Sequence, residues 1–201
     1  MPTKTALILC SCIIILLFDS CRSYHVSLTY TPPGPSARLY PGRPELRVGR
    51  INDTRDIKGT EIGAIRNEFG IPIKILHAKR PVAQIMHNAF TYALKIRDMS
   101  TLQNPGYTLS ADILELWCHQ YTTQNAGCRV RVNIYSTRNK TIVFSKTYAA
   151  KHTQPTLKVS YWSNVEEVAA VVSKALQSVV DSALDDPEFR RAMRHKSDGS
   201  H

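Results

Sequence analysis

Two stretches of the chain repeat apolar residues at spacings of three and four, the pattern of an amphipathic helix. The first covers 81–99 and has Pro81 in its first turn, where a missing backbone N–H costs nothing. The second covers 163–184 and opens on a Ser-x-x-Glu sequence that fits a capping box. The acidic pair and proline at 185–187 predict the end of this helix and a short third helix up to residue 194. Each long helix therefore presents one apolar stripe.

Between the two long helices the period of the apolar residues changes to two, which predicts β-strands. Three such runs, at 111–120, 128–136 and 141–150, give an antiparallel meander with one apolar face. Shorter runs at 24–30 and 46–53 predict one or two N-terminal strands. We therefore expect an α+β fold, a two-layer sandwich whose antiparallel sheet is covered on one face by two helices.

The two cysteines of the meander fall on the apolar side of their strands. A register that sets Cys118 opposite Cys128 also sets Leu116 opposite Val130, so both pairs share the buried face. Opposed Cα atoms in a non-hydrogen-bonded pair are about 4.5 Å apart, which a disulfide can bridge. This register predicts a cross-strand disulfide. The alternative is two small apolar thiols packed in the core.

The other face of the same two strands is polar and aromatic, with two arginines close together. It is our candidate partner surface, and the alternative is an ordinary solvated face. Its members are Trp117, His119, Arg129, Arg131 and Tyr135.

The start of the chain has the pattern of an export signal: a lysine, an apolar run over 6–18 and a cysteine at position 21. The run is shorter than the roughly 20 residues needed to span a bilayer. Phe18-Asp19-Ser20-Cys21 resembles the lipobox of bacterial lipoproteins, with Asp19 as a departure. We expect cleavage before Cys21 and acylation of it, since two or more acyl chains give stable anchoring. The alternative is ordinary signal cleavage that leaves a free thiol.

This pattern divides the chain into four parts. Residues 1–20 are expected to be the lipoprotein signal peptide, and 21–44 the lipidated cysteine with a proline-rich tether. Residues 45–194 form a single α+β domain, and 195–201 a disordered tail.

Charge and motifs reduce the number of function classes that fit the sequence. The net charge of +10 suits anionic partners, but acidic residues are interleaved with the basic ones, and export separates the protein from nucleic acid. The sequence has no HExxH, GxSxG or CxxC motif, and its histidines are scattered. Cys118 and His119 are adjacent, so on a strand they point to opposite faces. We expect no enzyme, no metal site, no cofactor and no nucleic-acid partner.

The segment VGRINDTRDIKGTEIGAIRNEFG resembles the YajG-type family of bacterial lipoproteins, in which a strand ending in Asp-x-Arg precedes a turn containing Ile-Gly. The matching residues are Asp53, Arg55, Ile62, Gly63, Arg66 and Gly70. The resemblance implies an envelope lipoprotein held in the membrane through acyl chains on Cys21. It further implies the outer membrane facing the periplasm, which Arg22 after the cysteine fits.

For function we expect a non-catalytic binding or accessory role with an envelope protein or glycan as partner. Two alternatives stay open. One is an auxiliary lipoprotein of an ABC-type lipid or solute transport system, and the other is a secreted small-ligand binder or enzyme without a lipid anchor.

Overall fold

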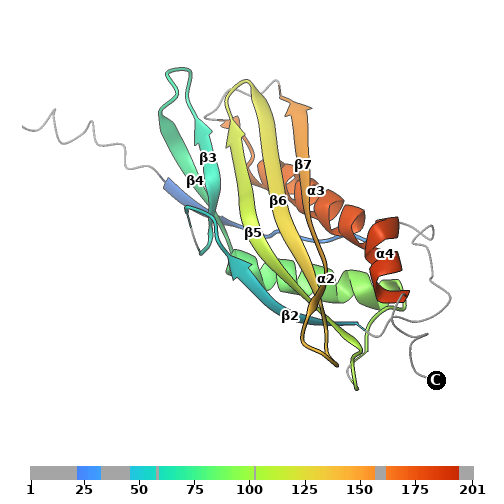
Figure 1. Ribbon diagram of the computed structural model, residues 1–201. Helices are drawn as coiled ribbons and strands as arrows, with labels where there is room; N and C mark the ends of the chain where they lie inside the picture. Colours follow the sequence, from blue (N-terminus) through green and yellow to red (C-terminus); the bar gives the residue numbers. More distant parts are fainter. Residues whose placement is uncertain (1–21, 33–45, 58, 102, 157–161, 195–201) are drawn as a thin grey trace, which may run out of the picture.

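The computed structural model describes residues 22–32, 46–57, 59–101, 103–156 and 162–194. Within these ranges a seven-stranded sheet packs against two long helices and one short one (Figure 1). The strands are β1 Arg22–Val26, β2 Leu46–Asp53, β3 Glu61–Arg66, β4 Pro72–Ala78, β5 Tyr107–Gln120, β6 Thr123–Ser136 and β7 Ile142–Pro155. The helices are α2 Val82–Ile96, α3 Val165–Leu184 and α4 Pro187–Arg194.

The two helices and the meander confirm the α+β sandwich, but the sheet is mixed and larger than expected. β5, β6 and β7 pair antiparallel, whereas β1 runs parallel to β4, and both β2 and β3 run parallel to β5. The strand order is β1-β4-β3-β5-β6-β7, with β2 also beside β5. Parallel neighbours need a long crossover, and α2 lies in the connection that brings the chain from β4 to β5. The prediction of a purely antiparallel sheet was therefore wrong.

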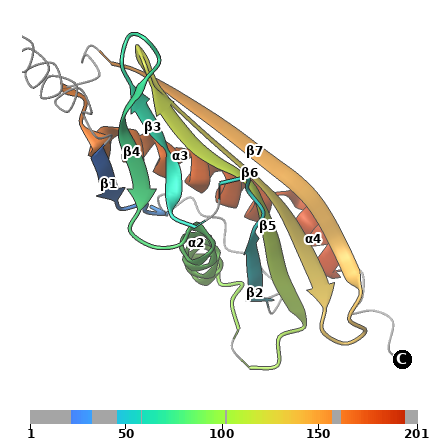
Figure 2. The same ribbon diagram turned by 90° about the vertical axis from the view of Figure 1, so that its left-hand side faces the viewer.

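Both long helices cover one face of this sheet, with their apolar stripes turned toward it (Figure 2). In α2 the stripe includes Met86 and Phe90, and in α3 it includes Val172 and Leu176, all fully buried. The helix α3 begins one residue later than its capping box predicted, because Asn164 accepts the bond from the Glu166 backbone N–H at 2.9 Å. The opposite face of the sheet carries no helix among the described residues.

The predicted register of the β5–β6 hairpin was wrong. Cys118 lies opposite Ala126, and Cys128 lies opposite Leu116, so the two cysteines are diagonal neighbours on the buried face. Diagonal neighbours are about 7–8 Å apart, which is too far for a disulfide. Both thiols are free and buried, as the core alternative had it. Burial raises the pKa of both to about 12.

The N-terminal strand expected near residues 24–30 is present as β1, Arg22–Val26. β1 forms the edge of the sheet beside β4, and residues 27–30 run on between α2 and α3. The backbone N–H of Thr29 donates to Ser173 Oγ at 3.1 Å. The proline-rich remainder, with the predicted signal peptide, Cys21 and the predicted tail, falls outside the described residues.

Candidate binding groove

A buried arginine holds the N-terminal segment against the two long helices. Arg97, just after α2, is fully buried and donates to Asp181 Oδ1 at 2.9 Å and to both carboxylate oxygens of Asp185 at 3.2 Å. It also donates to the Tyr30 hydroxyl at 3.1 Å, and that hydroxyl donates to Asp181 at 2.6 Å. Burial and the bond to Asp181 raise the pKa of Tyr30 well above its ordinary value, so it stays protonated as a donor. This cluster fixes one end of residues 27–30.

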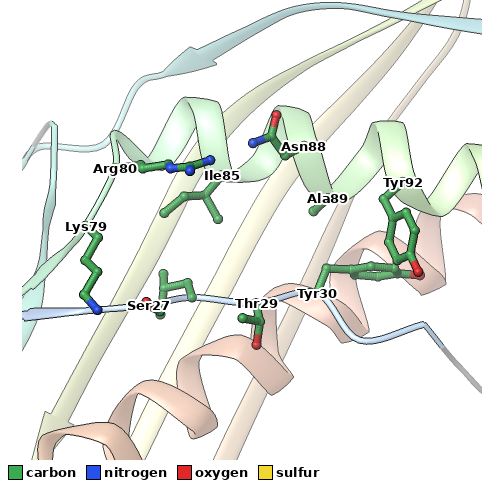
Figure 3. Close-up of a pocket in the computed structure, with 10 residues that line it drawn as sticks. Ser27, Thr29, Tyr30, Lys79, Arg80, Ile85, Asn88, Ala89 and Tyr92 are labelled. Carbon is green, nitrogen blue, oxygen red and sulfur yellow. The ribbon is translucent and has the colours of Figure 1, made fainter.

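The fixed segment and α2 enclose a groove of about 420 Å³, within the range of small-ligand sites (Figure 3). Lys79 and Arg80 lie at one end, and Tyr30 and Tyr92 lie at the other with their rings edge to face at 6.2 Å. Ile85 and Ala89 lie in the part between, together with the polar Thr29 and Asn88. The lining residues are Ser27, Leu28, Thr29, Tyr30, Lys79, Arg80, Ile85, Asn88, Ala89 and Tyr92.

The end of the groove with Lys79 and Arg80 suits an anionic group. Lys79 and Arg80 are exposed, and no carboxylate in the described part of the chain forms an ion pair with either. The lining contains hydroxyls and an amide but no carboxylate, imidazole or thiol. The arrangement suits a ligand with a negative group at one end and an apolar part beside it.

The predicted partner surface lies on the outer face of the sheet, and the structure divides it in two. Trp117 and His119 stack with ring centroids 5.0 Å apart. Burial and nearby Arg66 lower the pKa of His119, which favours a neutral ring in this stack. Tyr135 pairs with Thr108, far along the hairpin from this stack.

The half-buried Trp117 and the two arginines of this surface have structural explanations. The Trp117 indole covers Gly127, where an added Cβ would lie 2.6 Å from the ring. An aromatic side chain across from a strand glycine is a known stabilising arrangement. Arg129 pairs with Glu115 at 2.5 Å, and Arg131 lies opposite Asp112. The outer face therefore fits a solvated sheet face at least as well as a docking surface.

The Asp-x-Arg motif closes a gap in the sheet. β5 pairs with β2 as far as Ile113 and with β3 from Cys118 onward. Between these pairings the guanidinium of Arg55 donates to the Leu116 carbonyl at 3.1 Å and to the Glu61 carbonyl at 2.9 Å. Arg55 thus replaces the missing strand partner.

The same guanidinium donates two hydrogen bonds of 2.8 Å to the carboxylate of Asp53. Burial alone would raise the pKa of Asp53, but the bonds and charge of Arg55 outweigh it and hold the pKa below its ordinary value. Asp53 is therefore committed to an ion pair. No group of three or more metal-ligating side chains occurs among the residues with described positions.

Sequence reasoning missed the groove because its two walls are distant in the chain. One signal was present: Arg97 comes three and four residues after Leu94 and Ala93, on the apolar stripe of the first helix. A cation on that stripe must be buried with partners, and its acidic partners lie on the other long helix.

Comparisons with known proteins give the family. No curated protein matches the chain. Among solved structures, protein XCC0632 from Xanthomonas campestris is 14% identical with a TM-score of 0.64, and the match covers 87% of this chain and all of that one. The hypothetical protein CT253 from Chlamydia trachomatis is 10% identical with a TM-score of 0.51, over 73% of this chain and 96% of that one. At these identities the likeness shows a shared fold.

None of the helices in the described part of the chain is both long and apolar enough to cross a membrane. A family described as uncharacterized lipoprotein matches residues 51–194, from the end of β2 to the end of α4. The chain therefore belongs to this family of uncharacterized lipoproteins.

Proposed function

We propose that the protein is a lipid-anchored, non-catalytic binding protein of the bacterial envelope, of the YajG type. Acyl chains on Cys21 hold it at the outer membrane, facing the periplasm. Its groove binds an anionic group of another envelope component. The observation that carries the binding role is the pair of exposed cations, Lys79 and Arg80, at one end of a partly apolar groove.

The groove sets the chemistry of its ligand. A phosphate or carboxylate takes the end with Lys79 and Arg80, because a guanidinium and an ammonium both donate charge-assisted bonds to such oxygens. The apolar part of the ligand lies over Ile85 and Ala89 and meets the edge of Tyr92. A ligand of this kind is small or is a projecting group of a larger molecule.

Removal of the two cations tests the binding role. We expect Lys79→Ala/Arg80→Ala to weaken binding of dodecyl phosphate, below its micelle concentration, by about tenfold or more, since hydrogen bonds to charged groups contribute about 1.5–3 kcal/mol each. Isothermal titration calorimetry on protein lacking residues 1–21 measures it. The matched control, Arg47→Ala/Arg50→Ala, removes two exposed cations from β2. Equal affinities for both double variants, or no binding by the unchanged protein, would refute the groove as the site.

Labelling with a clickable fatty acid tests the anchor. In cells that make the full chain, we expect label in the unchanged protein and none in Cys21→Ala, because the sulfur and new amino group of that residue are the acylation points. Cys118→Ala is the control, since its buried thiol is inaccessible. Label that persists in Cys21→Ala, or an intact mass that retains residues 1–20, would contradict the lipoprotein assignment.

A further inference from the structure

Large apolar side chains are exposed together at one end of the molecule. Phe69 and Ile71 lie at the turn between β3 and β4, with 79% and 57% of their surfaces exposed. Tyr121 lies at the turn between β5 and β6, and Trp162, 81% exposed, precedes α3. Both turns and the start of α3 lie at the same end in both views (Figures 1 and 2). We name these four residues the aromatic end.

Hydrogen bonds join the segments that carry the aromatic end. The Tyr121 hydroxyl donates to the carbonyl of Glu68, next to Phe69, at 2.6 Å. The Ser163 carbonyl, next to Trp162, accepts from Lys74 Nζ of β4 at 2.9 Å. The four side chains therefore belong to one linked surface rather than to independent loops. Soluble monomers seldom expose large apolar side chains in such a group without a partner for them.

The anchor point lies beside this surface. β1 begins at Arg22, the residue after Cys21, and Arg22 pairs with Lys74 near the start of β4. One residue of chain spans at most about 3.6 Å, so acyl chains on Cys21 leave no spacer between the bilayer and the edge of the sheet. Lys74 also holds the loop that carries Trp162. Whatever surface receives the acyl chains is thus within reach of the aromatic end.

The charges here are mixed. Arg22 and Arg66 are exposed, while Glu68 and Glu166 lie nearby at the β3–β4 turn and in the first turn of α3. Such a surface has no strong preference for anionic lipid. Aromatic side chains, by contrast, favour the headgroup region of any bilayer.

We propose that the aromatic end lies in the surface of the phospholipid bilayer that holds Cys21, with Phe69 and Trp162 inserted at the level of the headgroups. The inference rests on the lipid anchor of the proposed function and adds a second, protein-made contact with the same membrane. This second contact sets the orientation of the domain, with the β6–β7 turn and α4 directed away from the bilayer.

The two tryptophans of the chain make the test direct. Acylated protein that begins at Cys21 is reconstituted into vesicles of phosphatidylcholine with or without bromine on the acyl chains, where the bromine quenches nearby tryptophan. In Trp117→Phe only Trp162 emits, and we expect brominated lipid to lower its emission about twofold or more. In Trp162→Phe only Trp117 emits, from the outer sheet face, and we expect a much smaller loss.

A second variant keeps the reporter and changes its surroundings. Phe69→Ser/Ile71→Ser in the Trp117→Phe background should reduce the quenching of Trp162 by about half, because the aromatic end then inserts less deeply. The matched control is Ile142→Ser, which removes an apolar side chain that is 54% exposed at the start of β7 and should leave quenching unchanged.

Vesicle flotation separates this proposal from the anchor. Protein that floats with vesicles while Trp162 stays unquenched overturns the membrane contact, leaves the anchor intact and assigns the aromatic end to another partner. Equal quenching of the two tryptophans also overturns it. Failure to float refutes the anchor itself, and with it the basis of this proposal.

Discussion

Replacement of Gly63 by alanine is expected to remove a large part of the stability of the protein. An added Cβ would lie 1.9 Å from the carbonyl oxygen of Cys118, far inside any tolerated contact. The backbone at Gly63 has φ of +143°, which side chains rarely adopt. Relief would require β3 to move away from β5, because Gly63 pairs with Cys118 in the parallel ladder between them. An added Cβ at this position is therefore incompatible with the pairing of β3 and β5.

We expect Gly63→Ala to lower the free energy of unfolding by about 4 kcal/mol or more, against a typical total of about 5–15 kcal/mol. Urea unfolding followed by circular dichroism measures it, and a low yield of folded protein would agree. Gly59→Ala and Gly70→Ala are matched controls, because their φ values of +82° and +77° are also positive but an added Cβ meets nothing within 4 Å. Each control should cost about 1 kcal/mol. Equal losses in all three variants would contradict the clash.

Arg55→Ala should be the second large loss. The guanidinium is only 5% exposed and satisfies one carboxylate and three carbonyl groups. Its removal leaves Asp53 without its cation and the Leu116 carbonyl without this donor. Breaking a buried pair in this way typically costs about 3–5 kcal/mol. Arg129→Ala is the matched control, since that arginine is 47% exposed in its pair with Glu115 and should contribute less than about 1 kcal/mol.

The pH dependence of the free energy of unfolding shows whether the ion pair with Asp53 accounts for the stability lost in Arg55→Ala. A pKa of Asp53 below its unfolded value stabilises the folded protein above about pH 4, and this contribution disappears as pH falls through the folded value. The stability gap between the unchanged protein and Arg55→Ala should therefore shrink between neutral pH and about pH 3. A gap that stays constant would mean that the carbonyl bonds, not the ion pair, account for the loss.

Local periodicity was sufficient to predict the helices and the meander. Stripes such as Met86 and Phe90, and alternation such as Val130 and Val132, are visible within a few neighbouring residues. The pairing of β2 and β3 with β5 was not predictable in this way, because it joins residues 55 to 61 positions apart in the chain. β3 itself was hidden in a charged, glycine-containing stretch that resembled a loop.

The register of the β5–β6 hairpin shows how a turn signal can mislead. Asn125 and Gly127 are residue types typical of turns, but both lie within β6, and the chain reverses at Tyr121 and Thr122 instead. Gly127 is small because the Trp117 indole lies over it, not because the chain turns there. This glycine is needed for packing between two strands. In the sequence alone, such a glycine looks the same as one that is needed for a turn.

The residues that carried the family resemblance have structural roles. Asp53 and Arg55 bridge the sheet, Gly63 permits close pairing with β5, and Arg66 donates to the carbonyl of Gly70 at 2.9 Å. They therefore identify the fold rather than a ligand. The groove and the aromatic end use other residues, and the motif could not have predicted either.

The position of β1 also gives the protein a mechanical property. A pull on the proposed anchor enters at Arg22 and acts along β1, so the bonds that join β1 to β4 are loaded in shear and share the force. Beyond β1, the same pull reaches Tyr30 and the ion pairs of Arg97 between the two long helices. Tension at the membrane would thus be transmitted to the wall of the groove, and ligand affinity would respond to force.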